Sequence, residues 1–172
     1  DLEAVLGDIV DRSLVVTRAE RAILFLGSTP EGVQVRMARD REGKDLVEPL
    51  TYSRSVLRRC LEQGAAVRSV VQSDEEALEL GKSVYDLKLR AVMCTPMIVR
   101  DRIIGAIYVD SRAMRREFTP RDLALFEAIS AQLAVSLENA RLHADSIEKL
   151  RLQTLVAQRS RRIVFQAAVA AW

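Results

Sequence analysis

Cysteine, histidine and long apolar runs are scarce in this sequence, and each shortage excludes a class of protein. Only two cysteines, Cys60 and Cys94, and one histidine, His143, occur among 172 residues, too few and too far apart for a disulfide framework or a metal site. No apolar run approaches the roughly 20 residues that a membrane-spanning helix needs. These shortages favour a protein of the reducing cytoplasm that carries no metal or other cofactor.

Net charge is also small. The chain has 26 basic and 24 acidic residues, a formal charge of +2 at pH 7. We therefore expect this domain to make no direct contact with nucleic acid or with a membrane surface. The short basic run at 158–162 fits a charged patch at a domain junction. Because the chain begins at Asp1 rather than at a methionine, we expect it to belong to a longer protein.

The spacing of apolar residues predicts an α+β domain with an antiparallel sheet. Ser53 suits the N-cap of a middle helix, and Gly64 suits its end. Pro96 has no backbone N–H, so it predicts a bulge or a position where the missing N–H faces away from a neighbouring strand. Strands joined by tight turns pair in antiparallel fashion, with helices packed on the faces of the sheet. The expected elements are helices at 1–16, 53–64 and 75–80, and strands at 19–28, 33–40, 65–71 and on both sides of a turn at 100–102.

The clearest local signal is the start of a last, long helix at Thr119-Pro120-Arg121-Asp122. Thr119 suits an N-cap, Pro120 the first helical position, and Asp122 the positive helix end. No breaker follows, so we expect about 40 helical residues, roughly 60 Å, and the second half should project from a small domain. Beyond Leu137, four residues at three-four spacing indicate a seam between two parallel helices: Ala140, Ala144, Ile147 and Leu150.

Three separated segments of the chain carry a family resemblance. They read "SRSVLRRCLEQGAAV", "YDLKLRAVMCTPMIVRDRIIGAIYVDSR" and "FTPRDLALFEAISAQLAVSLENARL". In this order they resemble the GAF domain, over roughly 1–142. The resemblance implies a central antiparallel sheet of about five or six strands, with the terminal helices on one side. Loops and short helices would close over a small-molecule pocket on the other side, and a long C-terminal helix would project.

The resemblance implies two parts and a regulatory role rather than an enzyme. Residues 1–142 would form the GAF sensor domain. Residues 143–172 would form a signalling-helix extension and the start of a linker to an output domain. The variant, with "SRSV" before the middle helix and "VDSR" after the last strand, is similar to GAF domains of bacterial multidomain signalling proteins. Those include enhancer-dependent transcription activators, nucleotide cyclases and two-component kinases.

By that likeness the domain binds a small cytosolic effector that the sequence does not name. It would form a homodimer through its N- and C-terminal helices. It would pass a signal along the last helix to a covalently linked output domain. The alternative is a dimerisation scaffold within a signalling protein that binds no ligand.

The expected pocket is defined only by segment. The third strand with the chain after it, the irregular segment that follows, and one position of the next strand should surround it. Tyr85 is the aromatic residue of that region able to stack on a ligand and to offer a hydroxyl. The candidate ligand-binding residues are Arg68, Ser69, Val71, Ser83, Tyr85, Leu87 and Thr95. The competing interpretation is that this segment packs on itself over a filled core.

The residues suited to chemistry have simpler structural interpretations. A reactive thiol needs a nearby base or positive dipole, and His143 is far from both cysteines in the sequence. Cys94 on a central strand and Cys60 on an amphipathic helix fit packing, which disfavours an enzyme that uses either thiol. His143 lies beyond the expected pocket, so we interpret it as solvated or part of a dimer seam rather than as a haem ligand.

Cyclic-nucleotide-binding GAF domains carry Asn-Lys, then Phe, then Asp-Glu. The matching positions here are Asp110-Ser111, Phe118 and Asp122-Leu123. Because only Phe118 and Asp122 match the motif, cyclic-nucleotide binding is disfavoured but stays an open alternative.

Overall fold

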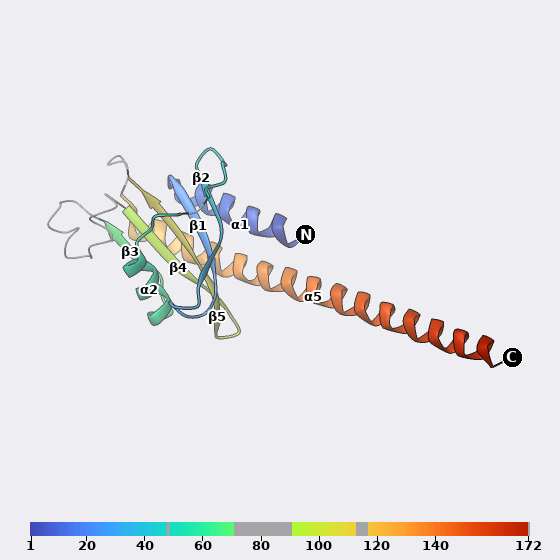
Figure 1. The fold of residues 1–172 in the computed structure, drawn as a ribbon. Helices are drawn as coiled ribbons and strands as arrows, with labels where there is room; N and C mark the ends of the chain where they lie inside the picture. The colour runs from blue at the N-terminus through green and yellow to red at the C-terminus, as the bar shows by residue number, and fades with distance from the viewer. Residues whose placement is uncertain (48, 71–90, 113–116, 172) are drawn as a thin grey trace.

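The described residues form a five-stranded sheet. Figure 1 shows helices on both faces of this sheet and one helix that runs far beyond it. The computed structural model describes residues 1–47, 49–70, 91–112 and 117–171. The elements are α1 (Leu2–Thr17), β1 (Arg21–Leu26), β2 (Gln34–Asp40), α2 (Arg54–Gln63), β3 (Val67–Val70), β4 (Ala91–Val99), β5 (Arg102–Ser111) and α5 (Pro120–Ala170). This α+β order is the predicted one. The helix expected at 75–80 lies outside the described residues.

The sheet is antiparallel throughout, in the order β2-β1-β5-β4-β3. β1 and β2 form one hairpin, and β4 and β5 form another. The second hairpin turns at Arg100 and Asp101, whose φ angles of 49° and 61° lie in the left-handed region. β1 pairs with β5, so the two hairpins meet at the centre of the sheet.

Different helices cover the two faces of the sheet. On one face, apolar residues of α1 and α5 share a core cluster with strand residues such as Met93 and Ile107. On the other face, α2 packs on residues that alternate with them, such as Phe25 and Tyr108. The prediction that the terminal helices share one side is confirmed, as Figure 1 shows. We call the opposite face, which α2 covers, the α2 side.

The predicted caps set the ends of α2 and the start of α5. The Ser53 hydroxyl accepts from the Val56 N–H, and Gly64 ends α2 in the left-handed conformation with φ 59°. At α5, Thr119 and Asp122 close a capping box, and Pro120 takes the first turn. Each of these caps joins residues a few positions apart in the sequence, so it could be predicted without knowledge of the fold.

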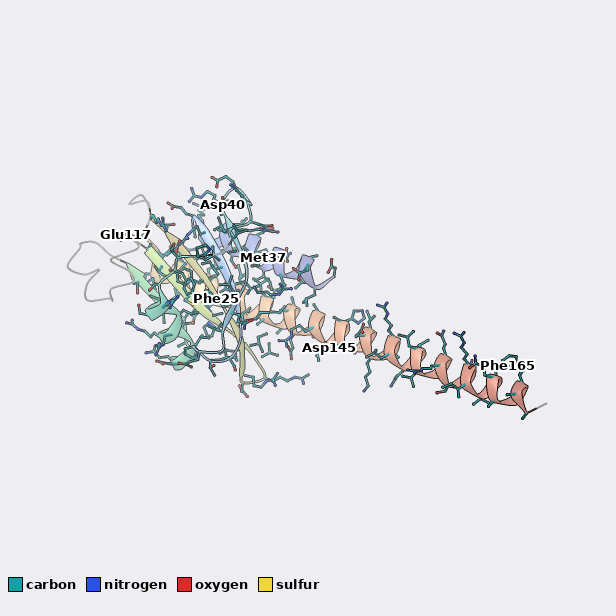
Figure 2. The ribbon with its side chains drawn as sticks, in the orientation of Figure 1. Phe25, Met37, Asp40, Glu117, Asp145 and Phe165 are labelled. Carbon is teal, nitrogen blue, oxygen red and sulfur yellow. The ribbon has the colours of Figure 1, made fainter. Side chains whose placement is uncertain are left out.

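Helix α5 is longer than expected. It spans 51 residues instead of about 40, because no glycine or proline interrupts the chain after Pro120. Its buried residues end at Leu137, and every residue from 141 to 170 is exposed. Side chains around Asp145 and Phe165 stand on a stretch of α5 that leaves the sheet behind (Figure 2).

Pro96 on β4 and Gly105 on β5 lie in paired strands near the β4–β5 turn. The structure explains why each of these residues fits its position. β3 pairs with β4 only as far as Cys94, so Pro96 lies where β5 is the one described neighbour of β4. The predicted irregularity is present, as a register shift between Met97 and Ile98. Gly105 lies so close to β1 that an added Cβ would overlap the Phe25 carbonyl oxygen and come within 2.7 Å of Met97 Cε.

We expect Gly105→Ala to lower the free energy of unfolding by about 3 kcal/mol, because the Phe25 backbone cannot yield without disturbing the central strand pair. Urea denaturation measures the change. Gly7→Ala is the matched control: its Cβ would meet the end of the Arg39 side chain, rather than backbone, at 3.2 Å, and alanine favours the helix. Equal losses from the two substitutions would contradict the account.

Candidate functional site

The α2 side of the sheet holds a cluster of three aromatic rings. The ring centroids of Phe25 and Tyr52 are 4.9 Å apart, and those of Tyr52 and Tyr108 are 6.1 Å apart. All pairs meet edge to face, the geometry that aromatic rings prefer. Phe25 from β1 and Tyr108 from β5 are fully buried. Figure 2 labels Phe25 over the sheet. The cluster joins the centre of the sheet to the chain that enters α2.

A chain of polar contacts continues from Tyr108 along β5. The Ser53 N–H donates to the Tyr108 hydroxyl oxygen at 3.0 Å, and Asp110 follows Tyr108 by two residues on the same face of β5. Asp110, which has no exposed surface, accepts two bonds from the Arg21 guanidinium at 2.9 and 2.5 Å. Arg21 also donates to the Thr51 carbonyl at 2.9 Å. The chain thus ties the segment before α2 to both central strands.

Burial is the largest cause of the pKa shifts of Tyr108 and Asp110. It raises the pKa of Tyr108 well above the ordinary value, and the Asp110 charge acts in the same direction. Burial also raises the pKa of Asp110, against the lowering effect of its bonds with Arg21. Because neither group is exposed and Tyr108 stays protonated, we assign these polar contacts a structural role on the α2 side.

Three of the predicted ligand-binding residues are described, and they do not share one face of the sheet. Ser69 is paired with Val92 and lies on the α2 side. Arg68 is paired with Met93, and Thr95 follows Met93 by two residues, so both lie on the face that α5 covers. The other four predicted residues lie outside the described residues: Val71, Ser83, Tyr85 and Leu87.

Each of the three described residues has a distinct environment. Arg68 donates from Nη1 to the Phe118 carbonyl oxygen at 2.7 Å, just before α5 begins. Thr95 is buried, with 2% of its surface exposed. Ser69 is 4% exposed, and its hydroxyl has no hydrogen-bond partner among the described residues. A buried hydroxyl without a partner is uncommon and calls for an explanation.

The sequence did not identify Arg21, Tyr52, Tyr108 or Asp110 as parts of the site. A charged residue at the end of an apolar strand does signal that a buried partner is needed. However, Arg21 and Asp110 are 89 residues apart, so only the pairing of β1 with β5 brings them together.

The family model of the GAF domain matches residues 1–139 of the chain. The chain belongs to the GAF domain family. The predicted family is therefore confirmed, and GAF domains are generally regulatory sensor modules, which is consistent with the predicted role.

Solved structures share the GAF fold with this chain at low sequence identity. The third GAF domain of Slr1393 from Synechocystis sp. PCC6803, in its photoproduct state, is 15% identical with a TM-score of 0.63, over 84% of this chain and 98% of that one. A domain of a putative two-component sensor histidine kinase from Sinorhizobium meliloti 1021 is 18% identical with a TM-score of 0.58, over 85% and 96%. The GAF-B domain of DevS from Mycobacterium smegmatis is 14% identical with a TM-score of 0.58, over 85% and 99%. These likenesses concern the fold alone.

Both cysteines of this GAF domain lie in the core of the α2 side. Cys60 on α2 and Cys94 on β4 have no exposed surface. Burial raises the pKa of the Cys94 thiol well above its ordinary value, and a hydrogen bond with Cys60 acts in the same direction. A thiol held in its protonated form is a poor nucleophile, which agrees with packing roles. Their contact was not foreseen, because nothing in the spacing signals it.

The other residues considered for ligand chemistry in the GAF domain have structural settings. His143 is exposed on the projecting part of α5. Within residues 1–47, 49–70, 91–112 and 117–171, no three His, Cys, Asp or Glu residues are grouped to hold a metal ion. Asp122, one of the two retained positions of the cyclic-nucleotide motif, closes the α5 capping box. No helix in the described part of the chain is long and apolar enough to cross a membrane.

Proposed function

We propose that this GAF domain is a regulatory sensor that binds a small cytosolic molecule on the α2 side, at the β3 edge of the sheet. In this proposal residues 1–142 form the sensor, and 143–172 carry the signal toward an output domain in the cytoplasm. The observation that carries the proposal is the buried hydroxyl of Ser69, which has no hydrogen-bond partner within the described part of the chain. A ligand that bonds with this hydroxyl would remove the cost of leaving it unsatisfied, about 1–3 kcal/mol.

The position of Ser69 supports transmission to α5. Its neighbour Arg68 points to the other face and donates to the Phe118 carbonyl, next to the Thr119 cap of α5. Its strand partner Val92 is followed by Met93, which belongs to the core cluster that α5 shares. A ligand that shifts β3 would therefore act on the start of α5 through covalent neighbours and one hydrogen bond. Such a signal requires that the ligand binds two arrangements of α5 with different affinity.

We further propose that the output is passed on by a homodimer, through α1 and α5 of two copies. The projecting part of α5 exposes large apolar side chains that no described residue covers. They are Leu142, Ile147, Leu150, Leu152, Leu155, Val156, Ile163, Val164, Phe165 and Val169. A second copy of α5 packed against these side chains would bury them.

The second candidate function is a dimerisation scaffold that binds no ligand. It is favoured by the packing beneath α2, where Phe25, Cys60 and Tyr108 have no exposed surface. Both candidates share the dimer, so only a test of ligand binding separates them.

We expect at least one compound in a thermal-shift panel of metabolites, cyclic nucleotides included, to raise the melting temperature with increasing concentration. Ser69→Ala should then weaken binding of that compound by about 10-fold, the effect of one lost hydrogen bond. Titration by calorimetry measures the affinity.

Ser130→Ala is the matched control, because the Ser130 hydroxyl is also buried and unpaired among the described residues but lies on α5. Both variants should be at least as stable as the original chain, since each removes an unsatisfied hydroxyl. If no compound shifts the melting temperature, the scaffold is favoured. If both serine variants weaken binding equally, Ser69 does not contact the ligand.

A further inference from the structure

A small cavity lies at the start of α2, close to the β1–β2 turn and away from Ser69. Its volume is about 180 Å³. It is lined by Pro30, Val33, Tyr52, Arg54, Leu57 and Arg58. None of these residues belongs to β3 or β4, and β2 and β3 form opposite edges of the sheet. The cavity is therefore separate from the ligand site of the proposed function.

One wall of the cavity is apolar and well supported. Leu57 is 4% exposed and belongs to the core of the α2 side. The Tyr52 ring is half-buried and held by edge contacts with Phe25 and Tyr108. Pro30 and Val33 complete this wall from the β1–β2 connection. Such a wall is already in place for an apolar group or a flat ring.

The opposite wall carries an unfavourable arrangement of charge. Arg54 and Arg58 stand four residues apart, on one face of α2, where like charges repel. Arg54 is also in the first turn, which holds no acidic residue, so its charge opposes the helix dipole. Among the described residues, no carboxylate pairs with either arginine, whereas Arg12, Arg21, Arg36 and Arg39 all have such partners. An anion between the two guanidinium groups would relieve both effects.

We propose that this cavity binds a small organic acid, with its carboxylate between Arg54 and Arg58 and its apolar part against Tyr52 and Leu57. The volume of the cavity limits the size of the ligand that fits. A cavity of roughly 150 Å³ holds benzene, whereas drug-sized ligands occupy about 300–1,000 Å³. The cavity therefore suits an acid with one ring or a short aliphatic chain rather than a nucleotide.

Benzoate is the probe that tests this site. Its binding to the full 172-residue chain is measured by NMR titration. We expect saturable shifts with a millimolar Kd, centred on the first turns of α2 and on Tyr52. Benzamide, which has the same ring without the charge, should bind at least about 10-fold more weakly. Inorganic phosphate, which has charge without an apolar part, should also bind more weakly than benzoate.

Arg54→Gln and Arg58→Gln should each weaken benzoate binding by about 10-fold or more. Arg59→Gln is the matched control, because Arg59 is exposed on the same helix but does not line the cavity. The proposal is overturned if benzoate does not saturate, if benzamide binds equally well, or if Arg59→Gln weakens binding as much as Arg58→Gln. Phosphate binding tighter than benzoate binding would overturn the apolar part of the site. None of these outcomes changes the test of Ser69.

Discussion

Replacing Arg21 by glutamine is expected to lower the free energy of unfolding by about 3–5 kcal/mol at pH 7. The cost arises because Asp110, with no exposed surface, would lose both bonds from the guanidinium and remain as an uncompensated buried charge. The Tyr108 hydroxyl cannot replace the guanidinium, because it is neutral and cannot compensate the Asp110 charge. Urea denaturation followed by circular dichroism measures the loss.

The loss should depend on pH in a defined direction. Burial raises the pKa of Asp110 in the folded protein, and Arg21 opposes that rise, so removing Arg21 should raise the pKa further. An unfolded aspartate has a pKa of about 3.9. A folded pKa above the unfolded one stabilises the protein at acid pH and loses that stabilisation as pH rises through the folded value. The difference between variant and original chain should therefore be full at pH 7 and shrink as pH falls toward about 4.

Two further variants test whether the instability comes from the buried Asp110 charge or from the loss of any paired arginine. Arg39→Gln makes the same change at a residue whose partners, Asp11 and Asp45, are exposed, and should cost less than about 1 kcal/mol. Combining Arg21→Gln with Asp110→Asn should recover most of the loss, because no buried charge remains. If the double variant is as unstable as Arg21→Gln alone, the buried carboxylate is not the cause.

The elements that sequence reasoning predicted well are those set by neighbours along the chain. The limits of α2 follow from the Ser53 cap and Gly64, and the start of α5 follows from Thr119 and Asp122. The antiparallel pairing of β4 with β5 follows from the short turn at 100–102. In each case the decisive contacts join residues a few positions apart. The α+β class and the side taken by the terminal helices were therefore predictable, the latter through the family resemblance.

The site was less predictable because its contacts join distant residues. Alternation along a strand sends Arg68 and Ser69 to opposite faces, but the sequence does not say which face each takes. The contact of Cys60 with Cys94 depends on how α2 lies across β4. The cavity beside Arg54 depends on the packing of α2 against the β1–β2 turn. Each of these features needs the fold before it can be seen.

The projecting part of α5 makes the strongest prediction about assembly. If Ala140, Ala144, Ile147 and Leu150 form the seam of a parallel pair, Ile147 and Leu150 would be buried in the dimer although they are 55% and 62% exposed in the single chain. Burying one such side chain contributes about 1.5–3 kcal/mol, and a dimer buries two of each. Replacing both residues by aspartate should therefore raise the dimer Kd by at least about 1,000-fold.

Sedimentation equilibrium of the 172-residue chain measures this Kd, with Leu152→Asp as the matched control. Leu152 lies five residues after Ile147, about 140° around the helix, so it points away from the expected seam. Leu152→Asp should leave the dimer intact while introducing the same kind of charge into the same helix. A loss of dimer caused by Leu152→Asp alone would place the contact on the other face of α5. An original chain that is monomeric at high concentration would remove the dimer from the proposed mechanism, because two α5 helices could not then change their relative position.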